Sequence, residues 1–306
     1  MDNLTHSLVG ALIGQAGLKK KTGLAMPALI IGANLPDVDA ACFFWLEGVE
    51  HLAFRRGITH GPPALVILPL ILAGLLWGWD RWQTSRGKRP EGRLPVHFGW
   101  LFALAFIGCL THPALDWMNV YGIRLLEPFS SRWFYGDVLF IIDVWLWLGM
   151  GLGLWFSLRR EKRGGDWRGL ARGVLAGVLG YIGMNAAITW RDELIAESTG
   201  SYPLNSIASP EPLFSWRREM ILEDQPEKFL IGTEKIGNMP LSSCDLAAAR
   251  AQSTQVDAFL FWSRAPVLGR LEDGRWQLSD ARYYAVRDGQ FSVILPDGLC
   301  SEPGAN

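Results

Sequence analysis

The sequence Thr111-His112-Pro113-Ala114-Leu115-Asp116-Trp117-Met118-Asn119 closes a long apolar run that begins near Phe98. His112 and Asp116 are four positions apart, so a helix places both on one face. An imidazole beside a carboxylate can bind a hard or borderline divalent metal ion. A single pair is weak support, but Thr5-His6, Pro36-Asp37-Val38-Asp39 and Thr59-His60 also lie beside apolar runs. We therefore ask whether these groups meet at one site.

The composition separates two parts of the chain. Of its 306 residues, 49% are hydrophobic and 19% are charged, whereas about 25% are charged in an average soluble domain. Long apolar runs fill most of residues 1–190, while residues 191–306 have the composition of a soluble protein. We expect a helical membrane domain at 1–190 followed by a small, β-rich, water-exposed domain at 191–306. The formal net charge of -1 gives no basis for nucleic-acid binding.

Apolar segments predict about six helices in the membrane domain. They cover residues 4–18, 23–35, 61–79, 96–115, 138–158 and 170–190. A span needs about 20 residues when upright, so the first two segments are short. They are expected to form a tight hairpin, and whether they cross the whole bilayer stays open.

The basic segments orient these helices. They are Lys19–Lys21, residues 80–93 and residues 159–168. If all of them lie in the cytoplasm, six crossings place the N-terminus and the C-terminal domain outside. Every candidate polar residue then falls at the outer interface: His6, Asp37, Asp39, His60, His112, Asp116, Asp137 and Asp143. Since the charge count does not use these residues, their agreement favours a single extracytoplasmic site in a multi-pass inner-membrane protein.

The candidate metal ligands each have a simpler alternative. A charged side chain near the bilayer centre costs about 2.5–3.5 kcal/mol, so the carboxylates need partners. A metal ion would satisfy several at once, but each could also cap a helix or face interfacial water. Asp39, for example, could cap a helix that begins near Ala40. The predicted ligands are His6, Asp37, Asp39, His60, His112 and Asp116.

Three carboxylates are candidates for a catalytic role: Asp37, Asp39 and Asp143. One of the first two could act as the general base. Asp143 interrupts an apolar run and is a ligand, a partner of a ligating histidine, or a salt-bridge partner of Arg124 or Arg132. These two arginines suit an anionic substrate group such as phosphate, although interfacial arginines also commonly extend to the headgroups without a ligand.

The C-terminal region carries strand-like segments separated by turn residues. Strands are predicted at Asp257–Ser263, Arg275–Leu278, Ala281–Val286 and Phe291–Leu295, after a turn-rich entry segment at residues 208–217. Cys244 and Cys300 lie in this region and would pair in an oxidising compartment. Cys42 and Cys109 lie near or within apolar runs and are expected to serve in packing.

Several motifs together resemble a known family. They are D-N-L-T-H-S near the start, L-P-D-V-D, R-R-G-I-T-H, T-H-P-A-L-D-W-M-N-V-Y-G and F-I-I-D-V. The set is similar to the YdjM/DUF457 family of bacterial inner-membrane proteins, which are described as metal-dependent hydrolases. The resemblance covers most of residues 1–150 and, more loosely, A-S-P-E-P-L-F-S-W-R. It implies a membrane location, a metal and the hydrolase class, but no substrate.

A more distant resemblance links the chain to the zinc-dependent phospholipase C and P1 nuclease group. That group also combines a helical H-x-x-x-D with an upstream Asp and His. The rest of its ligand set has no counterpart, because no histidine follows His112. The resemblance therefore implies one or two ions here rather than three.

These observations lead to one prediction and one alternative. We expect a metal-dependent hydrolase that acts on a lipid or lipid-linked phosphoester at the outer interface, with membrane lipids as its partners. A His and Asp ligand set without Cys favours zinc, with manganese as the other choice. The alternative is a non-enzymatic metal-binding or transport protein whose outer domain binds a partner. Against transport, the charged residues gather at one face instead of lining a path across the bilayer.

Overall fold

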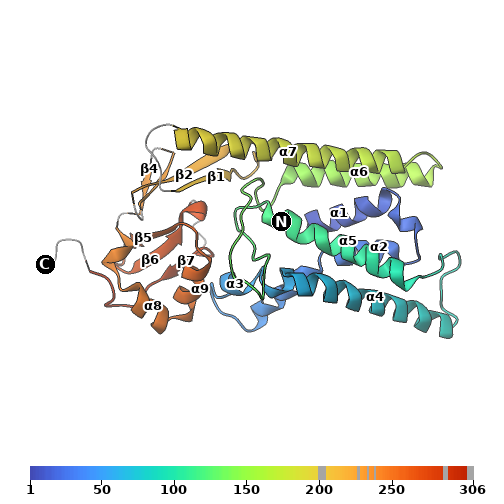
Figure 1. The fold of residues 1–306 in the computed structure, drawn as a ribbon, viewed down its shortest axis with the longest axis horizontal. Coiled ribbons are helices and arrows are strands. Elements are labelled where there is room, and N and C mark those ends of the chain that lie inside the picture. Colours follow the sequence, from blue (N-terminus) through green and yellow to red (C-terminus); the bar gives the residue numbers. More distant parts are fainter. Residues whose placement is uncertain (199–204, 226–227, 233, 238, 285–288, 302–306) are drawn as a thin grey trace. The chain divides into compact units, whose positions relative to one another are not determined.

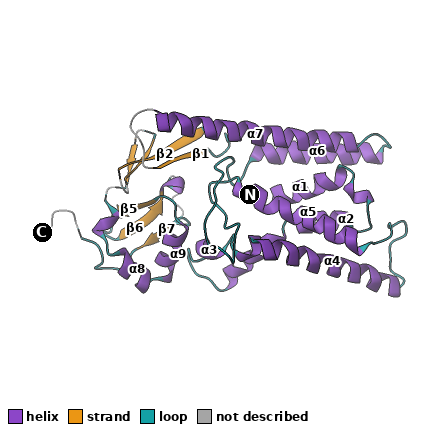
Figure 2. Cartoon of the chain, in the orientation of Figure 1, coloured by secondary structure: helices purple, strands orange, loops and turns teal. Residues whose placement is uncertain are grey.

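The chain combines a helical N-terminal region with a small C-terminal β-sheet domain (Figure 1). The computed structural model describes residues 1–198, 205–225, 228–232, 234–237, 239–284 and 289–301. Two compact units are present. The first comprises Met1–Val38, Arg56–Ala186 and Pro212–Ser215, and the second comprises Asp39–Arg55, Ala187–Glu211 and Trp216–Asn306. Helices make up the first unit, and both sheets belong to the second (Figure 2).

The N-terminal region alternates long helices with short ones. Its elements are α1 (Asn3–Gln15), η1 (Leu18–Lys20), α2 (Ala25–Gly32), η2 (Leu35–Phe44), α3 (His51–Phe54), η3 (Ile58–His60), α4 (Pro62–Ser85), α5 (Phe98–Trp117), α6 (Val144–Lys162) and α7 (Arg168–Ser198). The first two helices are short, as the apolar run lengths predict.

Three helices, α4, α5 and α7, are long and apolar enough to cross a membrane. The pair α2 and η2 passes the same test together and, bent by 53°, is a candidate for a fourth, broken span. The other two predicted crossings are not supported in this way. Helix α1 has only 13 residues, and α6 ends in a charged turn, Arg159-Arg160-Glu161-Lys162.

Helices α2 and α5 approach each other unusually closely. A Cβ added at Gly32 would lie 2.6 Å from the Ala105 carbonyl oxygen, and one at Gly108 would lie 2.5 Å from the Leu29 carbonyl oxygen. Only glycine leaves room for backbones at this distance. Leu29 and Ala105 are fully buried in the same core. This contact brings the end of α2 next to the last turns of α5.

Helices α1, α6 and α7 share a second core. Leu12 of α1, Met150 of α6 and Ala171 of α7 are fully buried in it. Asp2 caps α1 by accepting hydrogen bonds from the backbone N–H groups of Leu4 and Thr5. The Trp147 indole also donates to Asp2, at 3.1 Å, so the start of α1 is tied to α6.

The C-terminal region contains two antiparallel sheets. The first has the order β1-β2-β3-β4, and the second the order β5-β6-β7. The strands are β1 (Asn205–Pro210), β2 (Arg218–Gln225), β3 (Lys228–Ile231), β4 (Glu234–Ile236), β5 (Pro266–Arg270), β6 (Trp276–Asp280) and β7 (Ser292–Ile294). Ile207 and Ile221 from the first sheet and Val267 from the second lie in one buried core. The two sheets therefore form one folded body.

Two of the four predicted strands are confirmed as β6 and β7, and two predictions are wrong. Residues 257–263 fall mostly within α9 (Thr254–Trp262), which follows α8 (Leu246–Gln252). The Ser253 hydroxyl caps α9, and Val256, Phe259 and Trp262 are buried along it, at a helical spacing that the strand prediction overlooked. Residues 281–283 form a 3₁₀ turn, and Ala285 and Val286 lie outside the described residues. The first sheet was missed, although the predicted entry segment contains the end of β1 and the turn into β2.

The buried Asp280 carboxylate, at the end of β6, pairs with Arg282 and accepts hydrogen bonds from the segment after α9. Asp280 accepts from the Arg282 guanidinium at 2.7 Å and from the Ser263 hydroxyl at 2.6 Å, and both charged side chains are fully buried. Burial alone would raise the pKa of Asp280, but Arg282 and the hydrogen bonds hold that pKa below its usual value. The carboxylate therefore stays charged and fully satisfied in the domain interior.

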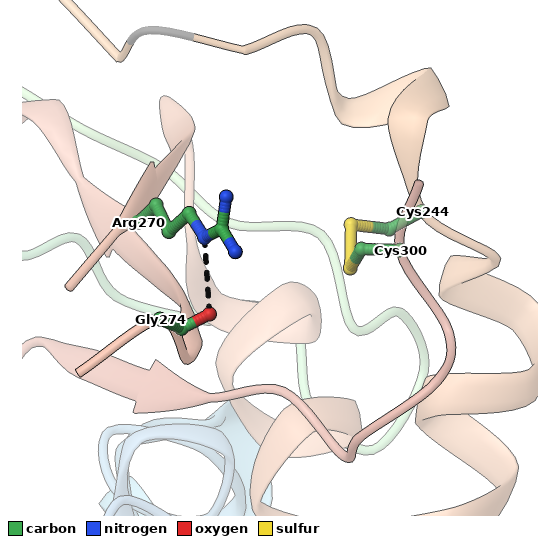
Figure 3. The surroundings of a disulfide bond; sticks show 4 residues. All are labelled: Cys244, Arg270, Gly274 and Cys300. Atoms are coloured by element: carbon green, nitrogen blue, oxygen red, sulfur yellow. Dashed lines mark hydrogen bonds between the residues drawn. A yellow bond between two sulfur atoms is a disulfide. The ribbon is translucent and has the colours of Figure 1, made fainter. Parts of the chain in front are cut away.

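The predicted pairing of Cys244 with Cys300 is present in the structure. Figure 3 shows the disulfide together with the β5–β6 hairpin, in which Arg270 Nε donates to the Gly274 carbonyl oxygen at 3.2 Å. The bond joins positions 56 residues apart in the sequence. Cys42 and Cys109 are buried free thiols, as expected for packing residues. A disulfide of this kind is typical of proteins folded in an oxidising compartment.

Removing this disulfide should loosen the C-terminal domain without disturbing the helices of the N-terminal region. A crosslink over a loop of this length typically contributes about 2–4 kcal/mol, so Cys244→Ser with Cys300→Ser should speed proteolysis of residues 205–301. We would follow cleavage by mass spectrometry, with and without a reductant. The reductant should bring the wild type to the rate of the double variant and leave the variant unchanged. The prediction would be contradicted if the reductant breaks the disulfide but the proteolysis rate of the wild type does not change.

Candidate metal centre

Four predicted ligands converge in the first unit: Asp37, His60, His112 and Asp116. Each offers one ligand atom, and these atoms all lie within 4.8 Å of one another. His112 and Asp116 come from the last turns of α5, as their spacing predicts. His60 ends η3, just before α4, and Asp37 lies at the start of η2, just beyond α2. Residues far apart in the sequence thus meet where several helices begin or end.

The separations between these atoms suit a single small cation. His112 Nε2 lies 3.5 Å from Asp116 Oδ2 and 3.7 Å from Asp37 Oδ1. His60 Nε2 lies 3.6 Å from the same Asp116 oxygen. Zinc bonds of about 2.0–2.2 Å in a tetrahedral site put the ligand atoms roughly 3.3–3.6 Å apart. The cluster is therefore close to the size that such an ion requires.

Local hydrogen bonds orient the two histidines. His112 Nδ1 lies 2.7 Å from the Ala33 carbonyl oxygen, which can only accept a hydrogen bond, so Nδ1 carries the proton. In the neutral ring the lone pair is then on Nε2, the atom that faces Asp37 and Asp116. This nitrogen is buried and has no hydrogen bond. His60 Nδ1 similarly lies 3.0 Å from the Thr59 hydroxyl.

Arg56 is a member of the site that the sequence analysis missed. Its Nε lies 3.1 Å from Asp116 Oδ2, and its Nη1 donates to Asn119 Oδ1 at 2.9 Å. The backbone of Arg56 is left-handed, with φ of 56°, a conformation unusual for a residue other than glycine. Arg56 stands in the R-R-G-I-T-H motif with His60, and Asn119 ends the stretch that carries His112. The sequence therefore held a signal for Arg56 and Asn119, because each lies in a motif that also carries a predicted metal ligand.

His6 lies beside the group of four. Its ring stacks on that of His112 with 3.8 Å between centroids, and its Nε2 lies 3.4 Å from Asp116 Oδ1. Both of its ring nitrogens are buried without a hydrogen bond. The Met1 amino group also forms an ion pair with Asp116. The simpler interpretation of His6 as part of a helix cap does not hold, since Asp2 caps α1.

Asp39 and Asp143 have other surroundings. Asp39 belongs to the second unit, where Arg55 Nε approaches its Oδ1 at 3.5 Å. Asp143 caps α6 by accepting from the backbone N–H groups of Trp145 and Leu146. Its second oxygen accepts from the Tyr181 hydroxyl at 2.9 Å and the Ser215 hydroxyl at 2.7 Å. The structure therefore gives Asp143 a helix-capping and bridging role.

The two predicted substrate-binding arginines differ in what surrounds them. Arg124 is buried, pairs with Glu127 at 3.0 Å and lies over the Trp133 ring. Arg132 is exposed and lies over the Phe134 ring. In the portion of the chain with described coordinates, Arg132 has no carboxylate within ion-pair distance. Arg132 is thus the better placed of the two to meet an external anion.

The burial of the cluster makes its charges expensive to leave uncompensated. His60, His112 and Asp116 are fully buried, and Asp37 is 9% exposed. Arg56 and the Met1 amino group offset part of the negative charge. Three buried ring nitrogens, both of His6 and Nε2 of His112, have no hydrogen bond, and in the neutral state each of these rings has one lone pair that a cation would satisfy. The residues present therefore fit a divalent metal ion bound by nitrogen and oxygen.

The fold and this cluster define a class, that of proteins with several candidate membrane spans and a candidate metal site formed by histidines and aspartates. A family model described as YdjM inner membrane protein matches residues 1–190. Because the match covers more than half of the chain, the protein belongs to the YdjM inner membrane protein family, and its location is the membrane. Searches among curated proteins and solved structures found no match.

Proposed function

We propose that this protein is a membrane-bound, metal-dependent hydrolase that cleaves a lipid or lipid-linked phosphoester at the outer membrane interface. The observation that carries the proposal is the convergence of Asp37, His60, His112 and Asp116 with all ligand atoms within 4.8 Å. Nitrogen and oxygen ligands without a thiolate suit zinc or manganese, one ion or two, in hydrolytic sites.

Each residue has a distinct part in this proposal. His112, His60 and Asp116 would hold the ion, and a bound divalent ion would supply Lewis acidity for the attack of water on phosphorus. Asp37 would be a fourth ligand or accept the proton of that water. Ala33 and Thr59 keep the histidine rings oriented through their Nδ1 atoms. Arg56 holds the Asp116 carboxylate in place.

The choice of substrate rests on the surroundings of the site. Trp117 and Leu126, near the cluster in the sequence, are exposed apolar side chains, as is Phe129. Arg132 is exposed and could pair with a phosphate group. A substrate with an apolar tail and an anionic head would satisfy both. The proposed outer location of the site follows from the basic segments, which favour the cytoplasm.

The test is a lipid-hydrolysis assay on the full chain. The protein would be placed in vesicles of phosphatidylglycerol and phosphatidylcholine with zinc or manganese, and released headgroup phosphates and diacylglycerol would be measured by mass spectrometry. We expect turnover that depends on the ion and disappears in His112→Ala. His97→Ala is the matched control, since His97 precedes the first turn of α5 and is exposed. It should retain full activity.

The assay separates this proposal from the non-enzymatic alternative. A protein that binds one ion per chain but hydrolyses neither these phospholipids nor polyprenyl phosphates or diphosphates would be a metal-binding protein. In that case the substrate proposal would fail while the metal centre remained. Activity that persists in His112→Ala would instead remove the centre from the mechanism.

A further inference from the structure

A second polar feature of the first unit lies where α6 turns into α7. The two helices run side by side and are joined by a short turn (Figure 1). A cavity of about 410 Å³ opens there, lined by Phe156, Arg159, Arg160, Arg163 and Leu170. It is formed by the last turns of α6, the residue after it and the first turn of α7. The metal centre has none of these residues.

The three arginines of this cavity have uncompensated charges. In the described chain, none of their guanidinium groups forms an ion pair with a carboxylate. The nearest acidic residues in the sequence are engaged elsewhere. Glu161 pairs with Lys19 and accepts from Gln15, and Asp166 accepts from the Gly169 backbone N–H at 3.2 Å. Three exposed guanidinium groups around one hollow attract an anion with several oxygen atoms.

The rest of the cavity is apolar and continues onto an apolar helix surface. Phe156 and Leu170 form its wall. Leu152, Trp155 and Phe156 are exposed on the same helix, on residues that precede the arginines. Trp155 lies under Arg159 at 5.2 Å, and exposed tryptophan beside basic residues is typical of the membrane–water interface. This arrangement suits a ligand with an anionic group at the charged side and an apolar part at the other.

We propose that this cavity binds the phosphate headgroup of an anionic phospholipid, with the first part of an acyl chain against Phe156 and Leu170. Arg159, Arg160 and Arg163 would hold the phosphate oxygens. Basic pockets between membrane helices are suited to such headgroups. A free phosphate ion has the same oxygen chemistry, but it would leave the apolar wall unused. The site is independent of the metal centre and of any hydrolysis there.

The experiment is lipid binding by the full chain in a neutral detergent, measured by native mass spectrometry. The probes are phosphatidylglycerol, phosphatidylcholine and inorganic phosphate. We expect phosphatidylglycerol to bind at least about tenfold more tightly than phosphatidylcholine. The triple variant Arg159→Gln, Arg160→Gln and Arg163→Gln should lose this preference. A control variant with Arg81→Gln, Arg86→Gln and Lys88→Gln removes as many charges from the basic segment at residues 80–93 and should bind within about twofold of wild type.

A milder pair of variants covers the case in which the triple variant does not fold. Leu170→Glu places a carboxylate in the cavity and should weaken phosphatidylglycerol binding by at least about fivefold, whereas Leu170→Gln should not. Equal binding by wild type and Leu170→Glu, or equal losses in the triple variant and its control, would overturn the proposal. Displacement of the lipid by millimolar inorganic phosphate would make a free anion the occupant and would also overturn it.

Discussion

His112→Ala should release the metal from the purified protein while leaving the chain folded in the membrane. The substitution removes a buried Nε2 that lies within 3.7 Å of both Asp37 and Asp116. Loss of a residue that only orients a ligand lowers metal affinity by about 10–100-fold. Loss of the ligand itself should therefore cost at least about 100-fold. The measurement is elemental mass spectrometry of protein loaded with zinc or manganese and then dialysed.

Two further variants make this result specific. His97→Ala should bind metal as the wild type does, because His97 is exposed at the other end of α5. Asp116→Asn should lose both metal and stability, since it leaves the Arg56 charge buried without its carboxylate. Breaking a buried pair in this way costs about 3–5 kcal/mol. Full metal content in His112→Ala would remove His112 from the ligand set.

Gly108→Leu should disrupt the packing of α2 against α5 and cause loss of the bound metal ion, although Gly108 is not a predicted ligand. A Cβ at Gly108 would lie 2.5 Å from the Leu29 carbonyl oxygen and 2.9 Å from the Ala33 nitrogen. These are backbone atoms, so no side-chain rotation relieves the overlap. The helices must separate, which also pulls the Ala33 carbonyl away from His112 Nδ1. Overpacking costs about 1–3 kcal/mol and more where backbones collide.

The same helix provides the control. A Cβ at Gly99 would meet nothing within 4 Å, so Gly99→Leu adds the same side chain without an overlap. We expect Gly108→Leu to lower the melting temperature by about 6–12 °C, as a loss of roughly 3 kcal/mol implies. We also expect it to lose bound metal, while Gly99→Leu keeps both. Fluorescence-detected size exclusion after heating would measure the first effect. Similar behaviour of the two variants would contradict the close helix contact.

Much of the candidate centre was predictable because its key pair is local. His112 and Asp116 share a helix face by spacing alone, and they do meet in the structure. Asp37 and His60 were predicted from their position at the ends of apolar runs, and the helices bring them to the same place. The sequence could not separate Asp37 from Asp39, because two residues in a 3₁₀ segment can belong to different packed units.

Interactions between residues far apart in the sequence could be identified only from the fold. Arg56 was quoted within a motif but not assigned, since its reach to Asp116 depends on a left-handed backbone and on the approach of α5. Asp143 was predicted as a catalytic residue, yet its oxygens accept from the α6 N-terminus and from Tyr181 and Ser215. Such contacts join segments that only packing brings together.

The sequence by itself determined the apolar candidate spans α4, α5 and α7, the His112–Asp116 pair, the pairing cysteines and the strands β6 and β7. These features depend on apolar length, on helical or alternating spacing, and on residue chemistry within short segments. Residues 254–262 carry the helical spacing of Val256, Phe259 and Trp262 in the sequence itself. For this segment the tertiary structure decided only that these side chains are buried in the C-terminal domain. It also decided which carboxylates and cations share a site, because buried charges are satisfied by whatever the packed chain places beside them.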